Sequence, residues 1–478
     1  MTIDRLSAID LAGQIKAGAF SPMEVLDATL AHIENTNPSL NAFITISAER
    51  AREEARAAEA VLAGGGDLPP QLTLLGVPYT VKDLVDTAGV RTTYASAILE
   101  HNIPEHDAVT VARMKAAGAV LVGKVSTPEF GHKPMNESPL FGRTVNPWDQ
   151  SRTSGGSSGG SAAALASGMA PLSIGTDAGG SIRIPAACCG VVGMKGTLGL
   201  VPHDNAPDGF GNFSNQGPMA RSVADAALML SVLAGPHPND PHSHGLPKDD
   251  YVGAAKGQGG LKGVKIGWLP FMGNALIDPE ILAACEVRRD ALADRGAEII
   301  VLDEPFENTE PYWLVITQSL WVARFEDKLA EFGGRMTPTL LRGIEEGKSY
   351  SAAELQRAIT FRTQLYRRVQ SWFERVGFLM MPTLSRTAID ADHNFYQPIT
   401  IGNRKAGGIR QTWYPYTHPF NMTGHPAITI PCGIMADGLP AGVQIVGPMM
   451  GDGAIIRLAA MIEQAHPWAH LWPDAATS

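Results

Sequence analysis

The sequence predicts an α/β protein with a mixed, mostly parallel central sheet that is covered by helices on both faces. Short apolar runs recur between longer amphipathic segments along the 478 residues, and such runs are typical of buried strands. Two of them, 264–269 and 298–302, flank a helix that begins at Asp278-Pro279-Glu280. A strand, a helix and a strand at this spacing predict a βαβ unit with parallel strands.

The N-terminal segment, residues 1–60, is predicted to be helical. Ser21 is followed by Pro22 and Glu24, which is the pattern of a capping box with proline in the first turn. Apolar residues then repeat every three or four positions, as on one face of a helix. We expect the α/β core to occupy residues 61–478.

The core is expected to alternate strands and helices. Its expected strands are 77–81, 119–122, 264–269, 298–302, 378–381, 427–430 and 442–446, and its expected helices are 107–117, 161–169, 279–295 and 452–465. Residues 303–375 are more highly charged and are predicted to form a helical lobe. The aromatic residues of this lobe are expected in its core: Trp313, Trp321, Phe325, Tyr366 and Trp372.

Composition and charge argue against several classes of protein. A net charge of -10 gives no basic surface for nucleic acid or anionic lipid. No stretch approaches the ~18 apolar residues of a membrane span, and Met1–Arg5 has no apolar signal-peptide core. We therefore expect a cytoplasmic protein. Its four cysteines form no C-x-x-C pair, which favours a reduced protein over a disulfide scaffold: Cys188, Cys189, Cys285 and Cys432.

Two glycine- and serine-rich segments and one lysine indicate acyl-transfer chemistry. Lys82 follows the expected strand over 77–81, and the two segments are Gly155-Gly156-Ser157-Ser158-Gly159-Gly160-Ser161 and Asp177-Ala178-Gly179-Gly180-Ser181-Ile182-Arg183. A serine hydroxyl is a weak nucleophile until a base takes its proton, and a lysine that burial keeps neutral can be that base. Glycine lets backbone N–H groups approach a developing oxyanion. These parts need neither histidine nor metal.

The first segment also allows two other interpretations. A serine/glycine run is often a flexible linker, but here the expected helix over 161–169 follows it directly. Gly155-x-Ser157-x-Gly159 also matches the nucleophile elbow of α/β-hydrolases, which needs a preceding strand and a later acid and histidine. Residues 150–154 make a poor strand. The acids and histidines that could complete such a site are Asp390, Asp392, His418 and His425.

Both segments and their flanks resemble the amidase signature family. The matching stretches are Pro78–Asp83, Gly123–Phe130, Asn146–Trp148, Gly155–Ala163, Gly175–Ala186, Gly217–Ser222 and Gly438–Gln444. The resemblance covers most of the chain outside about 303–420. It implies the mixed α/β fold of that family and a hydrolase of amide-type C–N bonds.

The resemblance also implies a role for individual residues. Ser181 is expected to be the nucleophile, Ser157 the bridging serine on a cis peptide, and Lys82 the base. The residues expected to form the oxyanion hole or to contact the substrate are Ala178, Gly179, Gly180, Ser158 and Met135. No metal and no other cofactor is implied.

Several polar and aromatic residues have more ordinary interpretations. Asp177 and Arg183 are expected to form a buried pair that holds the loop. A cluster of three histidines and one aspartate lacks the spacing of a metal site: His237, His242, His244 and Asp240. Loop-like sequence makes three aromatic residues candidates for a pocket wall: Trp413, Tyr414 and Tyr416.

Three functions are compatible with different parts of this sequence. A free-standing amidase would act on a small or medium neutral amide, with aryl acylamides and carbamates or urethanes among the substrates that the resemblance allows. A glutaminase subunit of a tRNA-dependent amidotransferase is disfavoured, because the tail around Gln464–Trp468 lacks the expected Asp-Ala-Tyr-Tyr segment. The intact Lys82, Ser157 and Ser181 argue against a non-catalytic binding protein. The expected partner is a small amide, without nucleic acid or membrane, and a homodimer is one candidate assembly.

Overall fold

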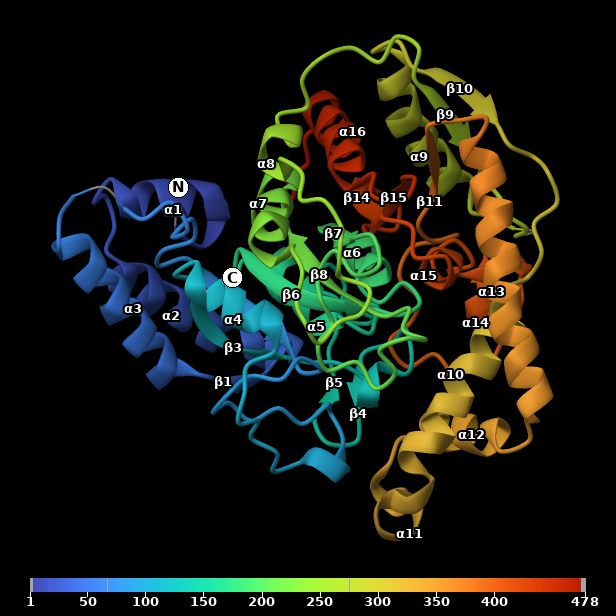
Figure 1. Ribbon diagram of the computed structural model, residues 1–478, viewed down its shortest axis with the longest axis horizontal. Helices are drawn as coiled ribbons and strands as arrows, with labels where there is room; N and C mark the ends of the chain where they lie inside the picture. The colour runs from blue at the N-terminus through green and yellow to red at the C-terminus, as the bar shows by residue number, and fades with distance from the viewer. Residues whose placement is uncertain (1–2, 67, 275, 474–478) are drawn as a thin grey trace.

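The computed structural model describes residues 3–66, 68–274 and 276–473, which fold around one large sheet (Figure 1). In this part of the chain the sheet has eleven strands in the order β1-β3-β2-β6-β8-β7-β14-β15-β11-β9-β10. Their bounds are β1 Phe43–Ile46, β2 Pro78–Lys82, β3 Val120–Val125, β6 Leu172–Asp177, β7 Val192–Lys195, β8 Asn215–Ala220, β9 Lys265–Trp268, β10 Glu298–Val301, β11 Phe378–Pro382, β14 Ala427–Ile434 and β15 Pro440–Val446.

The expected mixed sheet is confirmed, and its parallel pairs lie in its two flanks. β2 pairs in parallel with β3 and β6, and β9 pairs in parallel with β10 and β11. The strands between these flanks pair antiparallel. The predicted βαβ unit is β9, α9 (Pro279–Ala293) and β10. Two small hairpins lie outside the sheet: β4 Glu137–Ser138 with β5 Gly142–Arg143, and β12 Thr400–Ile401 with β13 Arg404–Lys405.

Helices cover both faces of the sheet, as expected. One face carries α2 (Pro22–Leu40), α3 (Ala48–Ala63), α5 (Gly159–Ala166) and α6 (Arg183–Cys189). The other face carries α1 (Ala8–Lys16), α4 (Val109–Ala116), α7 (Val223–Leu233), α8 (Tyr251–Ala254), α9 and α16 (Asp452–Ala465). Buried apolar side chains of the second group and of the sheet form one extended core cluster. None of the helices in the described ranges is long and apolar enough to cross a membrane.

The N-terminal segment differs from the expectation of helices alone. Residues Phe43–Ile46 form β1, which pairs antiparallel with β3 at the edge of the sheet. The run Phe-Ile-Thr-Ile is aromatic and β-branched, which favours a strand. Asn41 adopts a left-handed conformation that ends α2 and turns the chain into β1. Residues 1–60 therefore also contribute to the α/β sheet.

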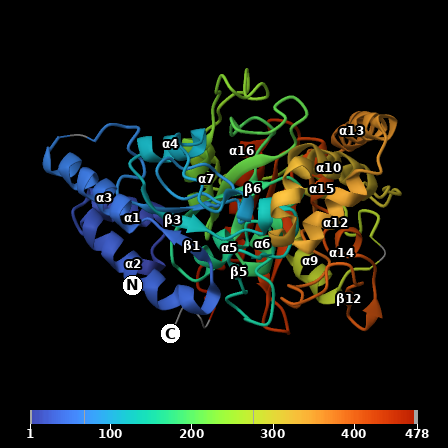
Figure 2. The same ribbon diagram turned by 90° about the horizontal axis from the view of Figure 1, so that it is seen from below.

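Residues 303–375 are helical, as predicted. They form α10 (Glu310–Phe325), α11 (Leu329–Phe332), α12 (Pro338–Gly347) and α13 (Ala352–Phe373), and short α14 (Ile409–Thr412) and α15 (His418–Met422) follow in the sequence. Helices α11 and α12 project away from the sheet (Figure 1). The N-terminal helices and this lobe lie at opposite ends of the molecule (Figure 2).

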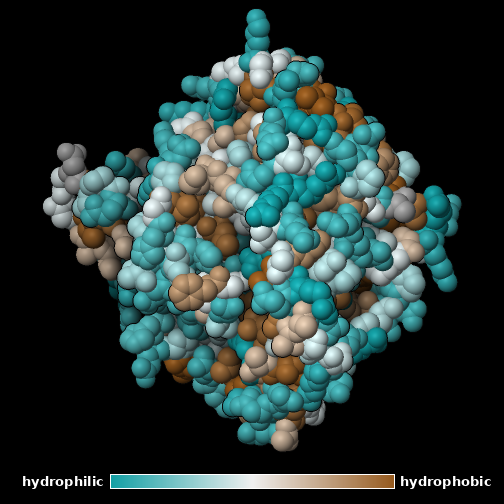
Figure 3. Space-filling view, turned by 45° about the vertical axis from the view of Figure 1, so that its right-hand side comes forward, coloured by the Kyte–Doolittle hydropathy of each residue, from teal (hydrophilic) through white to brown (hydrophobic). Residues whose placement is uncertain are grey.

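The surface shows no exceptional feature on the face seen in Figure 3. Hydrophobic side chains are dispersed among hydrophilic ones on this face.

The four cysteines are free thiols and are buried, as expected of a reduced protein.

Candidate active site

Lys82 ends β2 in the interior of the protein. Its side chain is fully buried, and its Nζ lies 2.6 Å from Ser157 Oγ and 2.8 Å from Thr176 Oγ1. Because β2 and β6 are parallel neighbours, Lys82 and Thr176 reach the same edge of the sheet. Burial lowers the pKa of Lys82 well below its usual value, against the opposing charge of Asp177. The amine can therefore be neutral and accept a proton.

Ser157 lies in a tight turn directly before α5. The peptide between Gly156 and Ser157 is cis, as the resemblance implied. The backbone passes so close to the loop at 133–135 that a Cβ on Gly156 would lie 2.8 Å from the carbonyl carbon of Pro134. Only glycine fits at this position without movement of the neighbouring chain. This close approach places the Ser157 hydroxyl beside Lys82.

Ser181 lies in the loop between β6 and α6 and lines a cavity. Its backbone carbonyl accepts the N–H of Ser158 at 3.0 Å, so the two serine segments are joined directly. Ser158 Oγ lies 3.2 Å from both the N and the O of Thr176 and is fully buried. Ser158 therefore contacts the sheet rather than the cavity, which favours a structural role.

The backbone at 178–181 presents several amides near Ser181. Ala178 and Gly179 line the cavity with Ser181. The N–H of Gly180 instead donates to Asp177 Oδ1 at 2.6 Å. Gly180 has φ +119°, and a Cβ there would lie 2.4 Å from the hydroxyl oxygen of Thr417, so only glycine can occupy this turn.

Asp177 and Arg183 form the expected buried pair. Arg183 donates to both carboxylate oxygens at 2.9 and 3.0 Å, and both side chains are inaccessible to solvent. Burial alone would raise the pKa of Asp177, but the Arg183 guanidinium and the Asn421 amide hold it well below its usual value. Arg183 also donates to Gln444 and Asn421. The pair therefore fixes the loop that carries Ser181.

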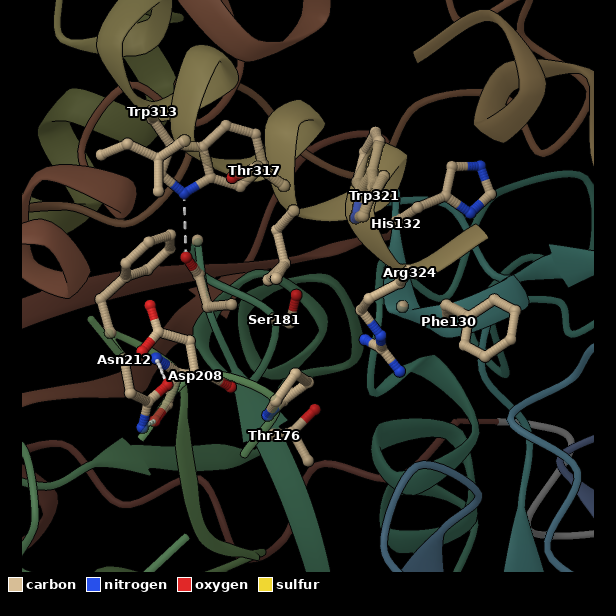
Figure 4. A pocket seen from close by; sticks show the side chains of 18 of the residues that line it. Phe130, His132, Thr176, Ser181, Asp208, Asn212, Trp313, Thr317, Trp321 and Arg324 are labelled. Atoms are coloured by element: carbon tan, nitrogen blue, oxygen red, sulfur yellow. Dashed lines mark hydrogen bonds between the residues drawn. The ribbon is translucent and has the colours of Figure 1, made fainter. Parts of the chain in front are cut away.

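The cavity has a volume of about 450 Å³. Figure 4 shows α10 above Ser181, with Trp313, Trp321 and Arg324 around the cavity, and Phe130 and His132 on a neighbouring wall. Trp313 donates from its indole nitrogen to the carbonyl of Ala178 at 3.0 Å. Loops at 130–134 and 203–214 and residues of α13 complete the wall. The helical lobe therefore contributes directly to the site.

Other residues lie elsewhere than their sequence patterns indicated. Trp313, which we expected in the core, lines the cavity, whereas Trp321 packs in a core cluster with Phe325, as expected, and also lines the cavity. Of the three aromatic residues expected on a pocket wall, Trp413 and Tyr416 are buried and Tyr414 reaches the cavity wall. Met135 is 2% exposed, packs in an apolar cluster with Ala162 and Ile182, and is not on the cavity wall. Thr176 had no predicted role, although it stands directly before the second glycine-rich segment.

The elbow interpretation finds no support in this geometry. In the described chain no regular strand leads directly into Ser157, because residues 152 and 153 form only isolated bridges. Asp390 pairs with Arg152 on the surface. His418 and His425 are buried, and burial lowers the pKa of each to about 3. Neither histidine is hydrogen-bonded to Ser157 or Ser181 in the described structure.

The histidine-rich loop has a structural arrangement. Asp240 accepts the backbone N–H groups of His203 and His242 at 2.9 and 2.8 Å, and Ser243 accepts that of His237 at 2.9 Å. Within the described ranges, no group of three or more histidine, cysteine, aspartate or glutamate residues is placed to hold a metal ion.

Comparisons with known proteins show the family to which this chain belongs. The family model described as Amidase matches residues 24–456. The chain is 34% identical over 474 residues to an acylamidase of Rhodococcus erythropolis, covering 98% of this chain and 97% of that protein. It is 36% identical over 499 residues to a glutamyl-tRNA(Gln) amidotransferase subunit of Roseiflexus sp. (strain RS-1), covering 99% of both.

Among solved structures, a bacterial aryl acylamidase of the amidase signature enzymes superposes with a TM-score of 0.91. It is 28% identical, and the match covers 99% of this chain and 98% of that one. Family model, relatives and fold agree along nearly the whole length. The chain therefore belongs to the amidase family with its amidase signature fold, and it is a hydrolase of carbon–nitrogen bonds other than peptide bonds.

Proposed function

We propose that this amidase cleaves an amide-type bond through an acyl-enzyme on Ser181, with Ser157 and Lys82 as its proton relay. The single observation that carries the proposal is the 2.6 Å approach of Lys82 Nζ to Ser157 Oγ in a fully buried setting. A buried neutral amine beside a hydroxyl is the arrangement that lets lysine act as a general base.

Lys82 takes the proton of Ser157, and Ser157 takes the proton of Ser181 as its oxygen attacks the substrate carbonyl. The tetrahedral oxyanion is stabilised by backbone N–H groups of the loop, for which Ala178, Gly179 and Ser181 are the leading candidates. Gly180 is a weaker candidate, because its N–H is already donated to Asp177. Removing one such donor typically costs about 10²–10³ in rate.

Collapse of this intermediate needs a proton on the departing nitrogen, since an unprotonated amine is a very poor leaving group. Ser157 donates to that nitrogen the proton that it received from Ser181, and Lys82 then returns a proton to Ser157. The acyl-enzyme is then released by water that the same relay deprotonates. The relay thus explains how a serine site without histidine can cleave amides.

The cavity supports a small or medium organic substrate. A volume of about 450 Å³ falls in the usual range for small-molecule sites. Its wall is rich in aromatic and aliphatic side chains, so the part of the substrate near the reacting amide is proposed to be neutral and apolar. Aryl acylamides and carbamates or urethanes meet this description. A cytoplasmic location, a homodimer and the absence of nucleic-acid and membrane partners stay predictions.

A second candidate is ammonia release from glutamine within an amidotransferase complex. The 36% identity to the amidotransferase subunit of Roseiflexus sp. (strain RS-1) over 99% of both chains favours it. In that case the isolated chain would hydrolyse glutamine poorly, would not cleave anilides or carbamates, and would gain glutaminase activity only with partner subunits.

Two measurements test these proposals. Labelling with a fluorophosphonate, read by intact mass and peptide mapping, should give a single adduct on Ser181 that is lost in Lys82→Ala. An adduct on Ser157 would contradict the assigned nucleophile. A panel of aliphatic amides, anilides, carbamates and glutamine, assayed with the isolated chain, then separates the free-standing enzyme from the glutaminase of a complex.

A further inference from the structure

Arg324 brings a positive charge to the cavity that no protein group neutralises. It lies in the last turn of α10 and lines the cavity. In Figure 4 its side chain enters the cavity between Ser181 and Phe130. Among the residues that the structure describes, none forms a hydrogen bond or an ion pair with its guanidinium. Arg324 is partly exposed, so its N–H groups are accessible to a bound molecule, and a positive charge on a largely apolar cavity wall favours an anionic partner.

The other charged groups on this wall have partners of their own. Lys133 Nζ lies 2.6 Å from a carboxylate oxygen of Glu137. Arg362 donates to the carbonyl of Gly211 at 2.9 Å. Asp208 accepts the N–H of the same Gly211 at 2.9 Å, and its charge acts on Arg362. These groups need no charge from a substrate.

His132, also on the wall, adds no competing charge. Burial lowers its pKa to about 3, so it is neutral at physiological pH. Its two ring nitrogens are hydrogen-bonded to the carbonyl of Glu129 and the hydroxyl of Thr339. Arg324 is therefore the distinctive cation of this part of the cavity.

Two aromatic rings lie near the Arg324 guanidinium, and no described residue is hydrogen-bonded to its N–H groups. Its Cζ lies 5.5 Å from the ring centre of Phe130 and 5.0 Å from that of Phe325. Rings contact a guanidinium through its face, whereas carboxylates are bound by the N–H groups at its edge. Burial lowers the pKa of Arg324, yet a guanidinium stays protonated in proteins.

We infer that Arg324 binds a carboxylate which the substrate carries beyond its reacting amide. The planar fork of N–H donors matches two carboxylate oxygens, and the low dielectric of the cavity strengthens the pair. The inference rests on the proposed function and refines it, since the substrate then carries a neutral region at its reacting amide and an anionic group at its other end. The substrate class is that of N-acyl compounds with a carboxylate on the acyl part or on the amine part.

Matched substrates and variants test this assignment. Two pairs differ in the carboxylate: para-acetamidobenzoate against acetanilide, and glutaryl against valeryl para-nitroanilide. Each pair is assayed with the wild type, Arg324→Gln and Arg324→Lys. Arg342→Gln is the control, because Arg342 is an exposed arginine on α12 that pairs with Glu346 and is not on the cavity wall.

For at least one pair, Arg324→Gln should lower kcat/KM of the carboxylate substrate about 10–100-fold, as expected for a hydrogen bond between charged groups. The neutral partner should change little, Arg324→Lys should restore part of the loss, and Arg342→Gln should change neither. Equal losses for both members of each pair, or no loss, would overturn the inference while leaving the proposed function standing.

Binding without turnover separates the two proposals. Calorimetry in the Lys82→Ala background measures the Kd of para-acetamidobenzoate and of glutaryl para-nitroanilide, with and without Arg324→Gln. Carboxylate binding that Arg324→Gln weakens supports the inference even if Ser181 takes no fluorophosphonate. Undetectable binding, or binding that Arg324→Gln leaves unchanged, contradicts it.

Discussion

Replacement of Lys82 by methionine tests the proton relay directly. Methionine is similar in length and apolar, so Lys82→Met keeps the volume of the buried site and removes only the amine. Two short contacts are lost, at 2.6 Å to Ser157 Oγ and 2.8 Å to Thr176 Oγ1. The variant therefore leaves both hydroxyls without this partner and leaves Ser157 without a base.

The structure lets the effects on activity and stability be estimated separately. Loss of a general base costs about 10²–10⁴ in rate. Two neutral hydrogen bonds are worth about 1–3 kcal/mol together, partly offset because a buried amine no longer has to be desolvated. For a chain of 478 residues, an unfolding entropy of about 2.1 cal/mol/K per residue gives about 1 kcal/mol per degree. Tm should therefore fall by less than about 3 °C.

The assay measures kcat/KM on the best anilide together with Tm by calorimetry. Lys124→Met is the matched control, since Lys124 is equally buried, bonds to Thr87 and Thr92 and not to Ser157, and has a pKa that burial lowers to about 8. It should cost stability with less than about a tenfold loss of rate. If Lys82→Met kept kcat/KM within about tenfold of wild type, or if Lys124→Met lost as much, the base assignment would be wrong.

Two buried residues, Asp177 and Lys195, and the half-buried Trp313 give three other predictions. Asp177→Asn leaves the Arg183 guanidinium buried without its carboxylate and should lower the unfolding free energy by about 3–5 kcal/mol; denaturant titration with unchanged stability would contradict this. Trp313→Phe removes the donor to the Ala178 carbonyl and should lower kcat/KM about tenfold with little change in Tm, whereas equal kinetics would show that the contact does not position the loop. Burial lowers the pKa of Lys195 from 10.5 to about 7, so between these pH values the unfolded state binds more protons and the free energy of unfolding should rise by about 1.4 kcal/mol per pH unit. Lys195→Met should remove this part of the pH dependence when the free energy of unfolding is measured from about pH 7 to 9. An unchanged slope in the variant would refute the assignment to Lys195.

Sequence patterns predicted seven of the eleven strands that the structure describes in the sheet, because their apolar runs are short, buried and bounded by turns, but they did not predict β1, β6, β7 and β8. The run Ala427–Ile430 and the helix Asp452–Ala465 were found at or near their bounds. The strand Phe43–Ile46 was missed, since its four residues follow a long helix and lack the length of a clear pattern. Its pairing with β3, which is distant in the sequence, decides its conformation.

The wall of the site was harder to predict than its motif. Trp313 and Trp321 have the spacing of a helix that buries one face, and nothing in that spacing tells a core from a cavity. Met135 lies near the motif in space, but its side chain turns into the apolar cluster. Whether such side chains face the cavity depends on which segments pack against the loop that carries Ser181, and tertiary structure decides this.

By itself, the sequence determined the chemistry available to this protein. Two serines, a lysine at a strand end and glycines that admit a close backbone are properties of local sequence, and they predict a lysine-assisted serine hydrolase. Tertiary structure decided which atoms meet: β2 lies beside β6, so Lys82 reaches Ser157 and Thr176. It also placed α10 over Ser181, with Arg324 in the cavity. Contacts between distant segments are set by packing, which local sequence does not encode.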